Sequence, residues 1–254
     1  MTDEDLAADL AIRAGALLVD LRASSGLSGG ALGAAGDARA NDAILAALGT
    51  ARPDDAVLSE ESTDSAARLS ARRVWIIDPL DGTREYRAGR NDWAVHVALS
   101  IDGEATLGAV ALPARDIVLR SDQTRPLTGE AARLRIATSR SRPAPVAAFA
   151  AERLGGTLVH IGSAGAKTAA VIMGEADAYL HSGAQSEWDN CAPVAVAQAA
   201  GLHCSRLDGA ALRYNRADVV VPDILICHPA RARQIIALAS EYRASHDDEP
   251  DTRR

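Results

Sequence analysis

Residues 74–83 read Val-Trp-Ile-Ile-Asp-Pro-Leu-Asp-Gly-Thr, and this stretch predicts a buried strand that ends in a tight turn. The segment Val74–Ile77 is apolar, β-branched and aromatic, which favours a strand. Pro79 fixes its own φ angle and lacks a backbone donor, while Gly82 tolerates backbone angles that other residues avoid. We therefore expect the chain to turn sharply after Asp78.

This turn carries the first candidate site. It directs Asp78, Asp81 and the Leu80 carbonyl toward one point, and converging hard oxygen ligands suit Mg²⁺ or Mn²⁺ better than a soft metal. An ordinary Asp-Pro turn with a solvated Asp81 is the alternative, and the short motif alone does not exclude it.

Length, composition and charge limit the classes of protein. The 254 residues are 48% hydrophobic and 24% charged, which is typical of one large globular domain or two closely packed halves. A net charge of -7 argues against binding to a nucleic acid polymer, whereas a metal ion would still allow a phosphorylated substrate.

The cysteines and the chain's N-terminal segment bear on localisation. Cys191, Cys204 and Cys227 are odd in number and lack CxxC spacing, so reduced thiols in the cytoplasm are the simplest account. The acidic start lacks the charged and apolar regions of a signal peptide, and no apolar run reaches the ~18–20 residues that span a bilayer. We predict a cytoplasmic protein without membrane contact.

The periodicity predicts an α/β (α+β) fold in two halves, residues 1–125 and 126–254, that form one compact unit. In the first half we expect a helix over 3–22, a Gly-rich mobile loop over 24–36, a helix capped by Asp37, strands over 57–59 and 74–78, a hairpin of 93–100 and 105–112, and a strand over 117–120. In the second half strands over 134–137, 158–161, 176–180 and 224–227 alternate with helices over 145–154, 164–173, 188–200 and 229–242, before a charged, frayed tail over 246–254.

Acidic residues stand at the ends of three expected elements. Glu60-Glu61 follows a strand, Asp78 and Asp81 follow the next, and Asp189 opens a helix. Each has an ordinary alternative, a solvated pair or an acid that complements the helix dipole. Together they indicate a cluster that holds more than one divalent cation, which is the expected machinery for phosphoryl transfer to water. A nearby hydroxyl, Thr83, could orient or pass the proton.

These residues resemble a known family. Glu60-Glu61, then Asp78-Pro79-Leu80-Asp81-Gly82-Thr83, then Trp188-Asp189 with Ala192, are similar in order and spacing to the inositol monophosphatase superfamily of Mg²⁺-dependent, lithium-sensitive phosphatases. The resemblance covers nearly the whole chain. It implies a layered α-β-α-β-α sandwich of the inositol monophosphatase and fructose-1,6-bisphosphatase type, with the metals between the two halves.

The resemblance also implies roles for individual residues. Thr83 would activate the attacking water, and Asp37, preferred to its rival Asp42, would orient Thr83. The metal ligands would be Glu60, Asp78, Asp81, Asp189 and the Leu80 carbonyl, with Glu61 among the catalytic residues and two or three Mg²⁺ ions, which Mn²⁺ could replace.

The residues after the turn resemble one branch of the superfamily. Arg84-Glu85-Tyr86, together with Glu187 before Trp188, is similar to the CysQ-type 3′(2′),5′-bisphosphate nucleotidases. This implies removal of the 3′-phosphate of 3′-phosphoadenosine 5′-phosphate to give AMP, in sulfur assimilation. A surface arginine that pairs with Glu85 is the alternative for Arg84.

A second phosphate needs donors, and residues 162–167 lie where a strand passes into a helix. Backbone amides at a helix N-terminus can hold an anion. We expect substrate contacts from Gly82, Thr83, Arg84, Ser163, Lys167, His181 and Asp189, although Lys167 could face the core or solvent, and His181 could be an exposed strand-end residue. We expect His96, inside the hairpin, to be structural.

The sequence therefore predicts a Mg²⁺-dependent bisphosphate nucleotidase. A broader inositol monophosphatase or fructose-1,6-bisphosphatase activity remains open, as does a phosphate-ligand binding protein on this fold that has lost turnover. The expected partner is a small phosphorylated nucleotide or sugar, and a homodimer is possible.

Overall fold

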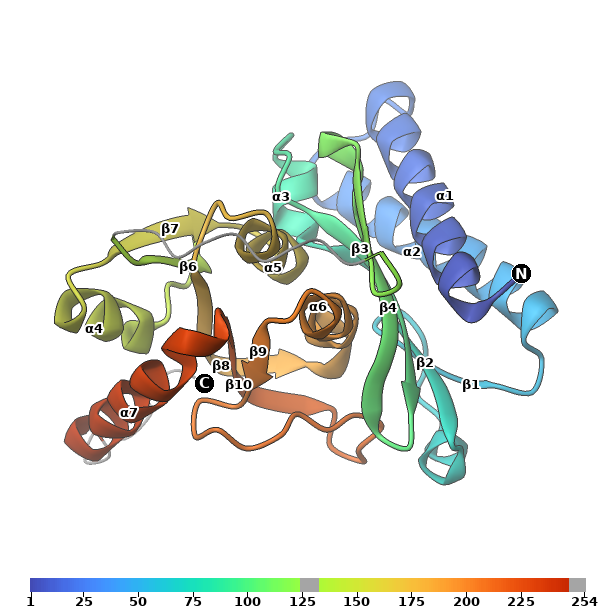
Figure 1. Cartoon of the computed structure of the whole chain (residues 1–254). Coiled ribbons are helices and arrows are strands. Elements are labelled where there is room, and N and C mark those ends of the chain that lie inside the picture. Colours follow the sequence, from blue (N-terminus) through green and yellow to red (C-terminus); the bar gives the residue numbers. More distant parts are fainter. Residues whose placement is uncertain (124–132, 247–254) are drawn as a thin grey trace.

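Five alternating layers of helices and sheets make up the computed structural model, which describes residues 1–123 and 133–246 (Figure 1). Helices α1 (Asp3–Ser24) and α2 (Gly29–Ala51) cover the outer face of the first sheet. Helices α5 (Ala164–Ile172) and α6 (Glu187–Ala199) lie between the two sheets, and α4 (Pro145–Arg153) and α7 (Pro229–His246) cover the far face of the second. The predicted layered α-β-α-β-α fold is confirmed.

The first sheet contains residues 74–81, the strand and turn that carry Asp78 and Asp81. Its five strands follow chain order, with β1 parallel to β2 and every later pair antiparallel. The strands are β1 (Ala56–Ser59), β2 (Arg73–Asp81), β3 (Ala94–Ile101), β4 (Glu104–Leu112) and β5 (Ile117–Arg120). The register of β2 against β3 shifts between Asp78 and Asp81, so the expected sharp turn is an irregularity inside a longer strand.

The second sheet is mixed and has the order β7-β6-β8-β10-β9. Its strands β6 (Arg135–Ser139), β7 (Thr157–Ile161) and β8 (Ala178–Ser186) run parallel, whereas β10 (Val220–Cys227) runs antiparallel to β8 and to β9 (His203–Ser205). Each sheet therefore draws its strands from one predicted half of the chain. The boundary that we predict at residues 125–126 and most of the predicted tail lie outside the described residues.

Three apolar cores fill the spaces between the layers. One core packs α1 and α2 on the first sheet around Trp75 and Ile77, and a second packs α5 and α6 between the sheets around Tyr179 and Cys191. The third core lies under α4 and α7 around Leu225. Because β2 alternates Trp75 and Ile77 with Val74 and Ile76 on opposite faces, both of its faces are buried and its end is held rigidly.

The predicted loop over residues 24–36 is wrong for most of its length, because α2 begins at Gly29. Five glycines in this segment favour a loop. In the folded chain Gly36 faces Leu80, Leu18 and Tyr86, and a Cβ atom there would lie 3.0 to 3.2 Å from their side chains. The close packing of helix on sheet outweighs the low helix propensity of glycine. Asp37 is consequently inside the helix and does not cap it.

Four short elements were not predicted. They are α3 (Thr83–Arg87), the 3-10 helices η1 (Ala66–Ser70) and η2 (Pro113–Arg115), and β9. Each is five residues or fewer, which is too short to show a period in the sequence. The remaining predicted helices and strands are confirmed within a few residues, except that β8 and β10 extend well beyond the predicted 176–180 and 224–227.

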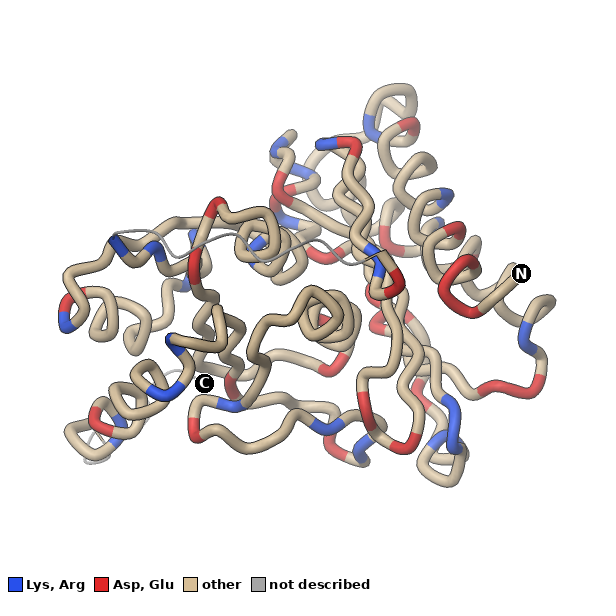
Figure 2. Tube along the Cα trace, in the orientation of Figure 1, with Lys and Arg blue, Asp and Glu red and all other residues tan. Residues whose placement is uncertain are grey.

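Charged residues of both signs are distributed over the described part of the chain. Figure 2 shows basic residues on many elements, interleaved with acidic ones. Exposed pairs such as Arg153 with Glu241 and Arg213 with Glu104 are typical. No helix among residues 1–123 and 133–246 is long and apolar enough to cross a membrane.

Tyr86, part of the triplet that suggested the nucleotidase branch, belongs to the core. Its ring is fully buried and packs edge-on against Trp93, and its hydroxyl donates to the Leu18 carbonyl of α1 at 2.7 Å. Tyr86 therefore joins α3 to α1 within the core.

We expect Tyr86→Phe to lower the free energy of unfolding by about 1 kcal/mol, because one buried hydrogen bond is lost while the ring remains. Chemical denaturation measures this change, and activity should stay near that of the wild type. Tyr242→Phe is the control, since the Tyr242 hydroxyl makes no hydrogen bond with the described residues. A large loss of activity in Tyr86→Phe would contradict this assignment.

Candidate active site

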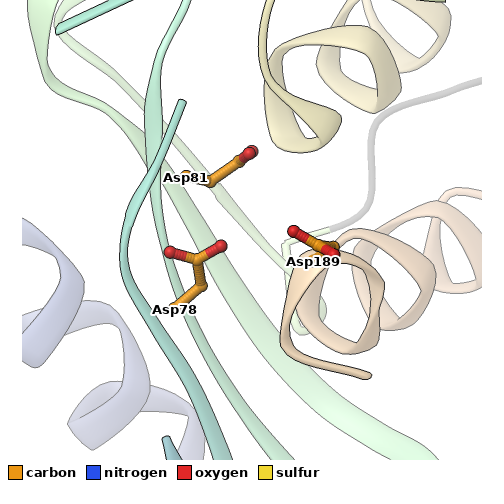
Figure 3. A group of neighbouring side chains, drawn as sticks. All are labelled: Asp78, Asp81 and Asp189. Carbon is orange, nitrogen blue, oxygen red and sulfur yellow. The ribbon is translucent and has the colours of Figure 1, made fainter. Parts of the chain in front are cut away.

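Three aspartates from the two halves meet between the layers (Figure 3). Asp78 and Asp81 come from the end of β2, and Asp189 comes from the first turn of α6. One carboxylate oxygen of each lies within 4.8 Å of the others, and both β2 aspartates are buried. Buried carboxylates at this spacing need a cation or protons between them, so the group can hold a divalent metal ion.

Asp81 is bound to the N-terminus of α5. Its Oδ1 accepts from the Ala164 amide at 3.1 Å, and its Oδ2 accepts from the Gly165 amide at 2.7 Å. We predicted that amides in this segment hold a phosphate of the substrate. They do hold an anion, but for Ala164 and Gly165 that anion is the carboxylate of Asp81.

The Asp81 carboxylate also contacts His96 of β3. The His96 Nε2 atom lies 3.1 Å from Asp81 Oδ2, an ion-pair distance, although the N–H is not aligned well enough for a hydrogen bond. Burial would raise the pKa of Asp81, but His96, Lys167 and the Gly165 amide together hold that pKa below its ordinary value. Asp81 therefore stays ionised.

The other two aspartates behave in the opposite way. Burial and the charges of Glu60, Asp81 and Asp189 raise the pKa of Asp78 well above its ordinary value. Burial and the charge of Asp81 raise the pKa of Asp189 to about 6. Without a cation these carboxyl groups compete for protons, which is the electrostatic signature of a site built for positive charge.

Glu60 and Glu61 follow β1 at the rim of this cluster. Desolvation of the carboxyl and the charge of Asp189 raise the pKa of Glu60 to about 7, although the residue as a whole lies on an exposed turn. Glu61 is exposed and contributes its charge to the neighbourhood of Asp37. Glu60 is thus the member of the pair whose carboxyl group interacts with the aspartates.

Asp189 also stabilises the helix that carries it. Its Oδ2 accepts from the Ser186 amide at 2.6 Å, closing the N-terminus of α6. Two residues earlier, the buried Glu187 carboxylate accepts from the Asn215 and Arg216 amides at 2.6 and 2.8 Å. The helix-end role that we set against metal binding is therefore real, and it leaves Asp189 Oδ1 directed toward the cluster (Figure 3).

Thr83 links the turn to α2. Its hydroxyl lies 3.2 Å from Asp37 Oδ1 and 3.2 Å from the Leu80 carbonyl, and can donate to either. Asp42, the rival of Asp37, is exposed and lines a hollow with Leu17 and Arg39 away from Thr83. Burial and the charge of Glu61 raise the pKa of Asp37 to about 6, so its carboxylate accepts a proton more readily than an exposed one.

A glycine in α2 makes the approach of Asp37 to Thr83 possible. A Cβ atom at Gly33 would lie 2.8 Å from the Thr83 methyl group, which is closer than real contacts allow. Gly82, which precedes Thr83, has φ +88°, a left-handed conformation that favours glycine. Both glycines therefore help to determine where the Thr83 hydroxyl lies.

The predicted substrate residues are only partly brought together. Arg84 is exposed at the start of α3. Ser163 is buried, and its hydroxyl caps α5 by accepting from the Ala166 amide at 3.0 Å. The Lys167 amine is also buried and donates to the Gly162 and Ser163 carbonyls, so its hydrogen bonds hold the turn before α5.

His181 does not lie at an exposed strand end. It lies within β8, and its Nδ1 atom is buried without a hydrogen-bond partner among the described residues. Burial and the nearby charges of Lys167 and Arg142 lower its pKa to about 4, so the imidazole is neutral. The exposed Arg142 guanidinium makes no hydrogen bond or ion pair with the described residues. Sequence reasoning missed Arg142, because nothing in its local pattern places it beside β8.

The alternating layers and the acidic cluster at the strand ends define a class of metal-assisted phosphatases. The sequence profile of the inositol monophosphatase family matches residues 21–244, and the chain belongs to that family.

Several relatives extend this finding. A Mycobacterium leprae protein named 3′-phosphoadenosine 5′-phosphate phosphatase is 50% identical over 95% of this chain and 94% of its own length. A protein of the same name from Mycobacterium tuberculosis is 51% identical over 91% of both chains, and the Salmonella typhimurium 3′(2′),5′-bisphosphate nucleotidase CysQ is 31% identical over 71% of this chain and 78% of its own. The crystal structure of CysQ from Bacteroides thetaiotaomicron shares the fold, with TM-score 0.78, 24% identity and coverage of 89% of this chain and 97% of that one.

The contact of Gly33 with Thr83 gives a matched pair of variants. We expect Gly33→Ala to lower kcat by about a hundredfold, because the new methyl group displaces the Thr83 side chain. Gly30→Ala, where a Cβ atom would meet nothing within 4 Å, should leave kcat unchanged and gain up to about 1 kcal/mol of stability from helix propensity. Equal kcat values for the two variants would contradict the role of Gly33.

The raised carboxyl pKa values predict how a metal stabilises the protein. Asp189 and Glu60 have ordinary values of 3.8 and 4.5 that rise to about 6 and about 7 on folding. The folded chain therefore binds protons more tightly than the unfolded chain, and their ionisation lowers stability as the pH rises from about 4 to 7.

A divalent cation binds the ionised carboxylates. At low pH it must compete with bound protons, whereas at high pH the carboxylates are already free of them. We expect the rise in Tm on adding Mg²⁺ to be larger at pH 8 than at pH 5.5, as measured by differential scanning fluorimetry. Asp78→Asn is the control and should reduce the Mg²⁺ effect at both pH values. A larger effect at pH 5.5 would show that these carboxyl groups do not bind the ion.

Proposed function

We propose that this protein is a Mg²⁺-dependent phosphatase that removes the 3′-phosphate of 3′-phosphoadenosine 5′-phosphate to give AMP and phosphate. The observation that carries the proposal is the cluster of Asp78, Asp81 and Asp189 beside the Thr83–Asp37 pair. The names of the two mycobacterial relatives and of CysQ support the choice of substrate.

The residues proposed to hold Mg²⁺ have oxygen donors of the kind that this ion prefers. They are Glu60, Asp78, the Leu80 carbonyl, Asp81 and Asp189. When bound, the cations would neutralise the phosphate and the leaving oxygen and lower the pKa of a water molecule at the site. Two or three ions are proposed, because the cluster gathers four carboxylates, and Mn²⁺ should replace Mg²⁺ at the same oxygen ligands.

The chain's own part in catalysis is to place and deprotonate the attacking water. When the Thr83 hydroxyl directs its proton to Asp37, its lone pair faces away and can accept a proton from water. Asp37, with its pKa at about 6, can take up the threonine proton in turn. Glu61 raises the pKa of Asp37 and is its proposed electrostatic partner.

Several residues are proposed to bind the two phosphates. Gly82 and Thr83 lie at the start of α3, where backbone amides can face the phosphate that is removed. Arg84, His181 and the exposed Arg142 are candidates for the second phosphate, with Ser163 at the base of the site. Lys167 is proposed to act indirectly, because its amine donates hydrogen bonds to the carbonyls of Gly162 and Ser163.

The remaining parts of the proposal concern the localisation, the oligomeric state and the alternative activities. Three free cysteines are compatible with a cytoplasmic enzyme of sulfur assimilation, and a homodimer is proposed from the family resemblance. A broader activity on inositol 1-phosphate or fructose 1,6-bisphosphate is the second candidate, since the relatives of known fold include an inositol monophosphatase from Anabaena. A binding protein without turnover is disfavoured because the carboxylates, Thr83 and Asp37 are all present.

The test compares kcat/KM for phosphate release from 3′-phosphoadenosine 5′-phosphate, inositol 1-phosphate and fructose 1,6-bisphosphate with Mg²⁺. We expect a preference on the order of a hundredfold for the nucleotide. Thr83→Ala is the control for contaminating phosphatases and should lose about 10²–10⁴ in kcat, whereas Thr83→Ser should recover much of it. Comparable rates on all three substrates would replace the proposal with the broader activity.

A further inference from the structure

His96 connects elements from both halves of the molecule at the carboxylate cluster. It lies in β3, its side chain is fully buried, and its two ring nitrogens face different elements. Nε2 lies 3.1 Å from Asp81 Oδ2, and Nδ1 lies 3.1 Å from the carbonyl oxygen of Trp188, the residue before Asp189. A single ring therefore touches one candidate metal ligand directly and the backbone beside another.

Helix α5 packs closely against the ring. A Cβ atom at Gly165 would lie 2.3 Å from His96 Nε2, so α5 can approach Asp81 only because residue 165 lacks a side chain. Nδ1 must carry a proton to bond the Trp188 carbonyl, since a carbonyl oxygen can only accept. The Asp78 carboxylate lies at 4.0 Å on the same side of the ring.

We propose that His96 is a positioning residue that holds Asp81 and the first turn of α6 at the spacing that a divalent cation requires. Asp81 Oδ2 is occupied by the Gly165 amide and faces His96, so that Oδ1, with one amide partner, is left for the ion. The contact to Trp188 fixes the start of α6 and hence Asp189. This inference rests on the proposed metal site and adds a residue that does not itself bind the ion.

Two substitutions separate the two contacts. In His96→Gln the amide can reach the place of Nε2 and still face Asp81, whereas in His96→Asn it can reach only the place of Nδ1 and face Trp188. His96→Leu removes both contacts and keeps a similar volume. Ser100→Ala is the matched control. Ser100 is buried in the same strand and on the same face as His96, two side chains further along that face, and its hydroxyl has no partner among the described residues.

The experiment is a titration of the metal-free protein with Mn²⁺ by isothermal calorimetry, without substrate. We expect the Mn²⁺ dissociation constant to rise about ten- to a hundredfold in His96→Leu, less in His96→Asn, and least in His96→Gln. In assays the Mg²⁺ concentration for half-maximal activity should rise by a similar factor, while kcat at saturating Mg²⁺ changes much less. Ser100→Ala should match the wild type in both measurements.

The proposal is overturned if folded His96→Leu, checked by circular dichroism, binds Mn²⁺ as tightly as the wild type does; if that variant does not fold, the same result for His96→Asn overturns it. It is also overturned if Ser100→Ala weakens Mn²⁺ binding as much as the His96 variant does, which would show a general effect of disturbing the core. A wild-type protein that binds Mn²⁺ but does not prefer the nucleotide leaves His96 in place and removes only the proposed substrate.

Discussion

The carboxylate of Asp81 is the group on which the rest of the site depends. It lies at the end of a strand whose two faces are both buried, and it accepts two backbone amides at the N-terminus of a helix from the other half of the chain. A buried carboxylate is costly unless it is paired, and here two amides and His96 provide the partners. The same bonds that keep Asp81 ionised also join the two sheets through α5, so the charge of the site and the packing of the layers cannot be changed separately.

The acidic residues of the site fall into two groups whose pKa values shift in opposite directions. Asp81 keeps its charge because it accepts from several donors. Asp78, Asp189 and Glu60 lie close to it with too few donors to offset the repulsion between the carboxylates, so their pKa values rise. A cation bound at the proposed metal site would relieve that repulsion. One proposed ligand would then be fixed in advance while the others would depend on the ion, which would couple metal affinity to pH.

Close approach of backbones determines the geometry of the candidate site as much as the charged residues do. Gly33 allows α2 to bring Asp37 to Thr83, and Gly165 allows α5 to reach Asp81 beside His96. These glycines have no chemistry of their own. Their effect appears only where a helix from one layer meets the end of a strand from another, and this explains why a glycine-rich segment that favours a loop in isolation is helical here.

The sequence by itself determined the fold class, most helices and strands, and the candidate ligands, because strand and helix periodicities and the Asp-Pro-Leu-Asp-Gly-Thr turn are local patterns within a few residues. The tertiary structure decided what those patterns leave open. It showed that residues 29–36 are helical, that the amides before Lys167 bind Asp81, that Tyr86 is core, and that His96 lies beside Asp81 and Trp188. Each of these depends on contacts between segments more than 40 residues apart or on different layers, and such contacts leave no period or motif in a single sequence.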